Sequence, residues 1–466
     1  MDTRLERDLI GELPVPGNVY WGIHTQRALL NFPFSYKRTH LRLVHAIVLV
    51  KKACCLANME LGFLKTLVGD CIVRACDEIL NGSYDDQFPI SALQGGAGTS
   101  LNMNVNEVIA NRALELMGYQ KGTYEHCQPI EHVNLHQSTN DVFPTALKVA
   151  AIGAVRRLSQ SAADLQGTLQ KKEKEFGSIV MIGRTELQDA LPITLGAQYA
   201  SWSEAVARDR WRAFKCEERL RVVNLGGTAV GTGLTAPRTY IFRVVEKLRE
   251  LCGYGLTRGE NLMDQTANAD AFVEVSGILS AHAADLGKIC SDMRQLHFIG
   301  EISLPRMQAG SSIMPGKVNP VIMEAVIGAA IKVQANHQII SECASRGSLQ
   351  INEFMPLIAD ALLESLDLME TSDKMLEAQV GSTKAIAEVC SENVNRTTLI
   401  VTALLPFIGY KKAEQLVTEY NSEQDGSFRD YLIKQIGSDM VEDALSPAQL
   451  MSLGYSRRRT ADADHA

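Results

Sequence analysis

The sequence lacks the features by which membrane chains, disulfide-rich chains and metal-dependent chains are usually identified. Its two most apolar windows, 41–61 and 398–410, are interrupted by Lys51 and Lys52 and by Pro406, so neither supplies the ~20 uninterrupted apolar residues of a membrane span. The N-terminus is charged and has no apolar signal core. The ten cysteines include no C-x-x-C pair, and no H-E-x-x-H spacing occurs. These absences predict reduced thiols, no metal site, no membrane partner and a cytoplasmic location.

The composition is that of an ordinary globular chain. Apolar residues make up 46% and charged residues 21% of 466 residues, which excludes a disordered or collagen-like chain. The net charge of −8 argues against nucleic acid as a partner. It still permits an anionic small molecule as ligand, because a local cluster of hydrogen-bond donors outweighs the electrostatic field of distant negative charges.

Apolar residues recur at steps of three and four along the middle of the chain. The three stripes are Val155, Leu158, Ala162, Leu165 and Leu169; Phe272, Val275, Leu279, His282, Leu286, Ile289 and Met293; and Ile358, Leu362, Leu366, Met369 and Leu376. This spacing predicts long helices that pack as a bundle, with few strands between them. We expect a mixed, mostly helical domain over 1–140, a helix-bundle domain over 141–392 and a small helical domain over 393–466, with a frayed tail from Arg457.

Two nucleotide-binding motifs are matched only in part. Gly231–Ala236 reads G-x-G-x-x-A, but the surrounding pattern is helical and the strand that should precede a dinucleotide loop is missing. Gly310–Lys317 is similar to a P-loop, yet five residues separate its glycines and Val318 stands where a hydroxyl should bind magnesium. We therefore expect no nucleotide site.

Four separated segments carry small hydrogen-bonding side chains. Gly98–Asn104 joins a glycine turn to a helix start, and 137–145 places Ser, Thr, Asn and Asp before a helix expected to begin at Pro144. Gly183–Ala190 is a third polar segment, and Gly310–Pro320 is a loop with two serines, one lysine and one asparagine. Each segment alone could serve as helix caps. Together they supply many neutral donors, one cation and no metal ligand set, which suits a small dicarboxylate.

These four segments, with the glycine stretch 225–234 between the third and the fourth, resemble the aspartase/fumarase superfamily over nearly the whole chain. The loop Gly310–Pro320 is similar to the long signature of that superfamily. Tyr20–Thr25 and Asn261–Leu262 resemble its aspartate ammonia-lyase members more than its fumarases. The resemblance implies a mainly α, three-domain fold whose long central helical bundle builds the core of a homotetramer, with sites shared between three subunits.

The resemblance also implies a reaction, the anti elimination of ammonia from L-aspartate to give fumarate, without metal or organic cofactor. Ser311, the first serine of a mobile loop, would be the general base that forms an enediolate intermediate. The implied substrate-binding residues are Thr99, Ser138, Thr139 and Ser312 for the distal carboxylate, Asn140, Thr185 and Glu186 near the leaving group, and Lys317 and Asn319 for the other carboxylate.

Three departures from the family pattern leave the substrate open. Glu186 stands where the family carries histidine or glutamine, and a carboxylate there would repel Glu324 unless one of them holds a proton or faces the substrate ammonium. Arg294–Glu301 replaces a longer S-G-P-R-x-G stretch, and Gln128–Asn134 differs from the usual N-P-N-D-x-V-N. Fumarate hydration, an N-substituted aspartate as substrate and a non-catalytic member of the superfamily stay open as alternatives.

Overall fold

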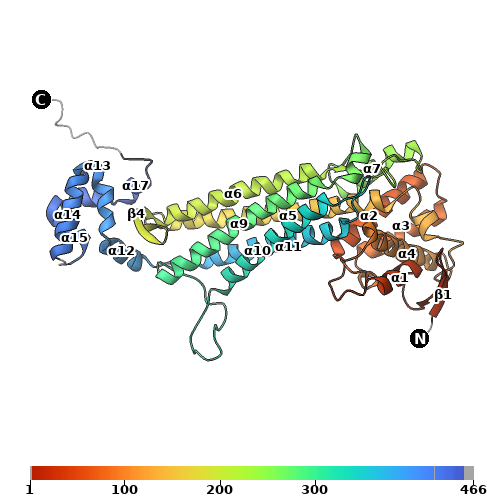
Figure 1. The fold of residues 1–466 in the computed structure, drawn as a ribbon, viewed down its shortest axis with the longest axis horizontal. Helices are drawn as coiled ribbons and strands as arrows, with labels where there is room; N and C mark the ends of the chain where they lie inside the picture. Colours follow the sequence, from red (N-terminus) through yellow and green to blue (C-terminus); the bar gives the residue numbers. More distant parts are fainter. Residues whose placement is uncertain (1–2, 424–425, 456–466) are drawn as a thin grey trace. The chain divides into compact units, whose positions relative to one another are not determined.

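Helices form most of the chain in the computed structural model, which describes residues 3–423 and 426–455 (Figure 1). The mainly α fold predicted from the apolar stripes is confirmed. By its contacts the chain divides into two compact units, here called unit 1 (Met1–Gln160, Arg210–Ala283 and Ala329–Glu370) and unit 2 (Ser161–Asp209, Ala284–Gly328 and Thr371–Ala466). The division into three domains stays a prediction, and the frayed tail predicted from Arg457 lies outside the described residues.

Five long helices each contribute one segment to unit 1 and one to unit 2. They are α5 (Thr139–Glu175), α6 (Leu195–Leu220), α9 (Asp270–Ile299), α10 (Val321–Ser345) and α11 (Met355–Ser382). Every residue of the three predicted apolar stripes lies on α5, α9 or α11 and is buried, His282 included. Steps of three and four return to the same face of a helix, so these stripes are the interior faces of the long helices.

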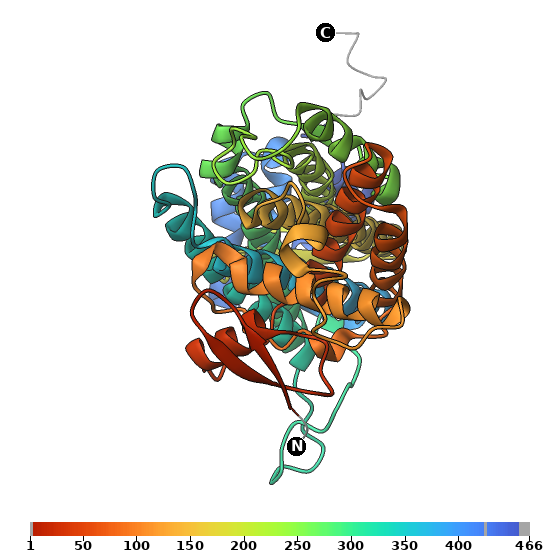
Figure 2. The same ribbon diagram turned by 90° about the vertical axis from the view of Figure 1, so that its right-hand side faces the viewer.

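Unit 1 surrounds its segments of the long helices with shorter elements. They are β1 (Thr3–Arg7), β2 (Glu12–Pro16), α1 (Ile23–Asn31), α2 (Leu41–Glu60), α3 (Thr66–Leu80), η1 (Asp85–Gln87), η2 (Gly96–Gly98), α4 (Thr99–Leu116), η3 (Pro129–Val133), β5 (Val222–Val223), α7 (Arg238–Cys252), β6 (Thr257–Arg258) and α8 (Leu262–Ala267). Helix α2 packs against α3, α4 and α7, and α1 packs against α4, as Figure 2 shows for the N-terminal part. Unit 1 therefore positions the start of α4 and the start of α5.

A buried carboxylate joins α1 to α4 in unit 1. Glu107 of α4 is 1% exposed and accepts hydrogen bonds from the backbone N–H groups of Gly22 (2.9 Å) and His24 (2.8 Å) and from Thr25 Oγ1 (2.6 Å). The first N–H groups of a helix have no partner within the helix. Glu107 supplies that partner for α1. The backbone of Gly22 lies so near this carboxylate that a Cβ added to Gly22 would be 3.0 Å from the Glu107 carboxyl carbon.

Ion pairs and polar bonds hold the long helices together within each unit. In unit 1, Arg156 of α5 donates two hydrogen bonds of 2.8 Å to Glu217 of α6. In unit 2, Ser161 of α5 donates to Asp373 of α11 (2.9 Å), and both side chains are buried. These bonds satisfy polar groups that the helix faces bury.

Unit 2 adds two short sheets and the C-terminal helices. Its elements are β3 (Val180–Thr185), β4 (Gln188–Thr194), β7 (Ile302–Ser303), β8 (Lys384–Ala385), α12 (Ala387–Arg396), η4 (Thr398–Leu404), α13 (Leu405–Ile408), α14 (Tyr410–Glu423), α15 (Phe428–Ile436), α16 (Ser438–Ala444) and α17 (Pro447–Leu450). A hydrophobic cluster between Val394 and Leu445 also takes in Ile182 of β3. The hairpin β3–β4 is thereby anchored to the core of the C-terminal helices.

All ten cysteines are free thiols, and eight of them are buried. Burial raises the pKa of Cys54 to about 12, so this thiol stays protonated at neutral pH. No helix in the described ranges combines the length and apolar character needed to span a membrane.

Candidate active site

The N-terminus of α4 places Thr99 at the surface of unit 1. Gly98 before it has φ +90°, and a Cβ at that position would lie 2.4 Å from the Phe143 ring, so only glycine fits this turn. Gln94 Oε1 accepts the N–H of Leu101 (3.2 Å) and so satisfies part of the first helical turn. The predicted helix start is confirmed, and Thr99 is the exposed first residue of an 18-residue helix, whose N-terminal end attracts anions.

The start of α5 carries Ser138, Thr139 and Asn140 and is fixed by the buried carboxylate of Asp141. One Asp141 oxygen accepts the Ser138 N–H (2.9 Å), and the other accepts the N–H groups of Gly226 (3.0 Å) and Thr228 (3.1 Å). Burial raises the pKa of Asp141 to about 6, although these donors oppose the rise. Asp141 thus ties the predicted substrate-binding segment to the glycine stretch 225–234.

The helix that was expected to begin at Pro144 begins at Thr139 instead. A proline inside a helix leaves the carbonyl four residues earlier without its usual donor, and here that carbonyl belongs to Asn140. Asn224 Nδ2 donates to this oxygen (2.9 Å), while Asn140 Nδ2 donates to the Ala229 carbonyl (2.7 Å). The donor comes from a residue 84 positions away along the chain, so the prediction from local sequence was wrong for a tertiary reason.

A buried lysine lies behind these two segments and was not identified as a candidate from the sequence. Lys51 of α2 has no exposed surface and donates to Asn134 Oδ1 (2.6 Å). The same oxygen accepts from Asn102 and Asn106 of α4, each at 3.2 Å, and Asn134 Nδ2 donates to the carbonyl of Gln137 (3.1 Å). Lys51 therefore links α2, the Thr99 helix and the loop that leads to Ser138. The signal in the sequence was a lysine within an apolar run.

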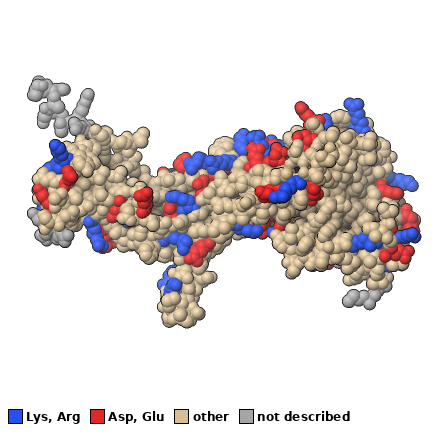
Figure 3. Space-filling model, in the orientation of Figure 1, with Lys and Arg blue, Asp and Glu red and all other residues tan. Residues whose placement is uncertain are grey.

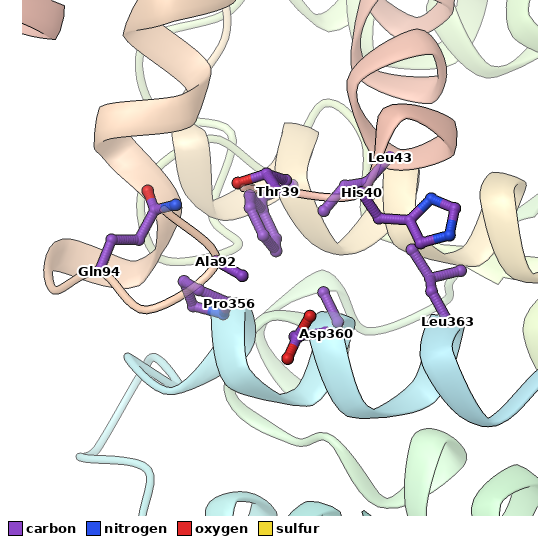
Figure 4. Close-up of a pocket in the computed structure, with 10 residues that line it drawn as sticks. Thr39, His40, Leu43, Ala92, Gln94, Pro356, Asp360 and Leu363 are labelled. Carbon is purple, nitrogen blue, oxygen red and sulfur yellow. The ribbon is translucent and has the colours of Figure 1, made fainter. Parts of the chain in front are cut away.

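The close-up in Figure 4 shows a small cavity in unit 1 beside these segments. Thr39 and His40 border it from the start of α2, Gln94 from the turn before α4, and Pro356 and Asp360 from α11. Its volume is about 10 Å³, which is roughly the space of one water molecule. The cavity is a packing feature and is too small for a four-carbon diacid.

Thr185 and Glu186 lie at the tip of the hairpin β3–β4 in unit 2, within the polar segment Gly183–Ala190. The two turn residues, Glu186 and Leu187, have φ of +52° and +62°, the left-handed pair of a type I′ turn, which usually contains asparagine or glycine. Arg184 holds the hairpin by donating to both oxygens of the fully buried Glu301 (2.7 and 2.9 Å). Thr185 and Glu186 themselves are exposed.

The serine loop, defined here as residues 304–320, extends from unit 2 between α9 and α10 (Figures 1 and 3). Its base is closed by Gly310 N–H donating to the Lys317 carbonyl (2.7 Å) and by Asn319 Nδ2 donating to the Gly310 carbonyl (3.1 Å). Arg306 and Lys317 are its charged residues, and it contains no acid. Ser312 and Lys317 are exposed, so the loop presents a hydroxyl and a cation to solvent.

Ser311 occupies a distinct position in this loop. Its Oγ accepts the backbone N–H groups of Ile313 (3.2 Å) and Met314 (3.0 Å). Two backbone donors on one hydroxyl oxygen stabilise negative charge on that oxygen. This arrangement is compatible with the serine base that the resemblance implies.

A second cavity, of about 560 Å³, opens at the base of the serine loop in unit 2. Arg294, Phe298, Val318 and Glu324 are among its lining residues. Glu324 pairs with Arg294 at 3.5 Å, and α9 ends at Ile299, so the shortened stretch 294–301 forms one wall. Glu324 thus has a cationic partner within its own unit.

The site residues fall into two groups along the chain. Thr99, Ser138, Thr139 and Asn140 belong to unit 1, whereas Thr185, Glu186, Ser311, Ser312, Lys317 and Asn319 belong to unit 2. Across the described ranges of this single chain, no hydrogen bond joins the serine loop to the hairpin tip. Each group is organised by its own buried polar residues, and their convergence on one ligand stays a prediction.

Comparison with known proteins places this architecture in a family. Residues 11–335 match the family model described as "Lyase". Aspartate ammonia-lyase from a Bacillus species is 39% identical, with 98% of this chain and 99% of that protein covered, and aspartate ammonia-lyase from Escherichia coli strain K12 is 39% identical, with 99% and 98% covered.

Solved structures agree with the sequence comparison. A protein from Brucella melitensis described as "fumarate lyase:delta crystallin", bound to cobalt, superposes with a TM-score of 0.91 at 37% identity, with 97% of this chain and 100% of that chain covered. Class II fumarase from Schistosoma mansoni superposes with a TM-score of 0.89 at 30% identity, with 96% and 99% covered. With the serine loop, the hairpin tip and the two helix starts in the order that the resemblance implies, the chain belongs to the lyase family of the aspartase/fumarase superfamily.

Proposed function

We propose that this chain is a carbon–nitrogen lyase that converts L-aspartate reversibly to fumarate and ammonia. The proposal is supported by relatives named aspartate ammonia-lyase that match nearly end to end. The structural observation that supports it is the Ser311 hydroxyl, which accepts two backbone N–H groups within the serine loop.

The reaction proceeds in two steps. Ser311 Oγ, as the alkoxide, takes a proton from the carbon beside the distal carboxylate, and the electron pair of that C–H bond moves into the carboxylate to form an enediolate. The pair then returns to form the double bond as the C–N bond breaks and ammonia leaves with the bonding electrons. The proton on Ser311 passes to ammonia, so the products are fumarate and ammonium.

Neutral donors and one cation bind the substrate. Thr99, Ser138, Thr139 and Ser312 hold the distal carboxylate, where charge builds in the intermediate. Lys317 and Asn319 hold the other carboxylate, and Thr185 and Asn140 lie near the leaving group. Preorganised donors of this kind stabilise developing charge more than water does, because they need no reorientation during the reaction.

Glu186 accepts the substrate ammonium, in this proposal. Arg294 already partners Glu324 at 3.5 Å, which leaves Glu186 available to a positive group of the substrate. A carboxylate facing the substrate nitrogen favours an amino acid over malate. Changing Glu186 to glutamine should weaken aspartate binding and should have little effect on malate.

The first test is a substrate screen that follows fumarate absorbance with L-aspartate, L-malate and N-substituted aspartates. We expect turnover of L-aspartate and a loss of about 10²–10⁴-fold in Ser311→Ala. Ser303→Ala, in the strand β7 before the loop, is the matched control and should keep its activity. Turnover of malate or of an N-substituted aspartate in place of aspartate would reassign the substrate, and full activity in Ser311→Ala would refute the mechanism.

We infer further that the enzyme is a homotetramer whose sites combine residues from three subunits. The division of the site residues between units 1 and 2 is consistent with shared sites. Ser311→Ala and Thr139→Ala proteins, each inactive alone, should recover activity after dissociation and mixing, because random assembly restores about one site in four with both native residues. Tetramers that are mixed by mass spectrometry but remain inactive would contradict shared sites.

A further inference from the structure

The chain makes a tight turn over residues 134–137 in unit 1, directly before Ser138. The N–H of Gln137 donates to the carbonyl of Asn134 (3.1 Å) and closes the turn. His136, the third residue of the turn, has φ +62°. Residues with a side chain seldom adopt this left-handed conformation, and glycine or asparagine is usual at such a turn position. A histidine there needs contacts that stabilise it.

The side chain of His136 makes three contacts within unit 1. Its Nδ1 lies 2.8 Å from Oδ1 of Asn58, a buried residue of α2. The ring of Phe63 meets the imidazole edge to face, with 5.0 Å between the centroids, and the ring of the fully buried Tyr240 of α7 lies at 5.2 Å. Burial lowers the pKa of His136, so the imidazole is neutral at neutral pH. An amide oxygen can only accept, so His136 Nδ1 carries the hydrogen and donates it.

Helix α2 holds the turn at two points. Asn58 Nδ2 donates to the carbonyl of Leu135 (3.2 Å), so one amide group bonds to both central residues of the turn. Lys51 donates to Asn134 Oδ1 (2.6 Å), and Asn134 Nδ2 donates to the carbonyl of Gln137 (3.1 Å). Lys51 and Asn58 lie on the same face of α2, because seven residues are about two helical turns. The turn is therefore fixed to α2 from its first residue to its last.

Ser138 is positioned from both of its sides along the chain. On the helix side, Asp141 Oδ1 accepts its N–H (2.9 Å). On the other side, the peptide group that precedes Ser138 belongs to the turn. A shift of the turn would rotate this peptide and displace the hydroxyls of Ser138 and Thr139. A displacement of about 1 Å in a substrate-positioning group can cost 10²-fold in rate.

We propose that His136 is a positioning residue for the elimination reaction, because its hydrogen bond to Asn58 holds the turn in the place that aligns the Ser138 and Thr139 hydroxyls. The inference rests on the proposed function, since these hydroxyls bind the distal carboxylate there. Charge builds on that carboxylate in the transition state, so a displaced hydroxyl weakens transition-state binding more than substrate binding. Loss of the hydrogen bond should therefore lower kcat more than it raises KM.

The test compares His136→Gly with the native protein by steady-state kinetics, on whichever diacid the native protein turns over. Glycine adopts φ +62° without strain, so this variant permits the backbone of the turn but lacks the imidazole. We expect kcat to fall about tenfold or more and KM to rise less than about threefold. His126→Gly removes an exposed histidine from the same connection between α4 and α5. It is the matched control and should keep the native kinetic constants.

Asn58→Leu removes the same hydrogen bond from the side of α2. The carbonyl of Leu135 keeps Gln137 Nε2 as a donor at 3.2 Å, so this variant also tests the inference if His136→Gly does not fold. We expect a similar loss of kcat, and the double variant should lose no more than the larger single loss, because both changes remove one interaction. Additive losses in the double variant would refute the role of this hydrogen bond.

Hydrogen–deuterium exchange separates positioning from overall stability. The peptide that spans residues 134–140 should exchange faster in His136→Gly and in Asn58→Leu than in the native protein, and unchanged exchange would refute the inference. An active native protein whose two variants keep the native kcat would overturn this inference alone. A native protein that turned over no diacid would overturn the proposed function and this inference with it.

Discussion

Replacing Arg184 with methionine should expose how the hairpin tip is held. Arg184 donates to both carboxylate oxygens of Glu301 (2.7 and 2.9 Å), and Asn393 Nδ2 adds one neutral donor at 2.9 Å. Glu301 is fully buried, so in Arg184→Met its charge would remain in the interior with one neutral partner. The strand β7, which leads into the serine loop, begins directly after Glu301.

The size of the effect follows from this geometry. Leaving a buried charge without its partner costs about 3–5 kcal/mol. Glu301→Gln should cost less, about 1–3 kcal/mol, because Arg184 is partly exposed and keeps Asp189 as a partner at 3.3 Å. In the double variant no charge is left buried without a partner. Its loss of stability should therefore be smaller than the sum of the losses in the two single variants by about 1–3 kcal/mol.

Urea unfolding followed by circular dichroism measures these differences as shifts of the midpoint. The kcat for aspartate reports separately whether the hairpin tip with Thr185 and Glu186 keeps its position. Arg306→Met, which removes an exposed arginine from the serine loop, is the control and should change stability by less than about 0.5 kcal/mol. Simple additivity of the Arg184 and Glu301 changes would refute the paired-charge explanation.

Two further predictions concern unit 1. Burial lowers the pKa of Lys51 to about 7, whereas an unfolded chain keeps the ordinary pKa near 10.5. Between these pH values the unfolded state binds the proton and the folded state does not. The free energy of unfolding, relative to that of Lys51→Met, should therefore rise from pH 7 to pH 10.5. If urea unfolding gave the same stability difference between the native protein and Lys51→Met across that pH range, the prediction would be wrong. Pro144→Ala returns an N–H to the Asn140 carbonyl, so Asn224→Ala should cost about 1 kcal/mol less in that background than in the native chain. Equal costs in both backgrounds, again from urea midpoints, would exclude the proposed replacement donor.

Much of the architecture could be read from local sequence. Steps of three and four apolar residues place one face of a helix in the interior wherever the helix lies, and the stripes of α5, α9 and α11 are buried as that rule predicts. Gly98 before Thr99 marked the start of α4, and the glycines and prolines of 310–320 marked a loop. The resemblance of that loop to a known signature supplied Ser311, Ser312, Lys317 and Asn319 as candidates, because these residues lie within the matching segment itself.

Other features depended on partners that are distant in the chain. The turn Glu186–Leu187 contains neither glycine nor asparagine, so the local sequence does not predict a type I′ turn. The hairpin is stabilised instead by the hydrogen bonds that Arg184 donates to Glu301, 117 residues away. Pro144 can lie inside α5 because Asn224 replaces the missing donor, and Lys51 is tolerated in an apolar run because Asn134 meets it. Hydrophobic periodicity is a local property, so it can be recognised from the sequence alone. A buried polar group must instead find its partner in three dimensions, and only the tertiary structure identifies that partner.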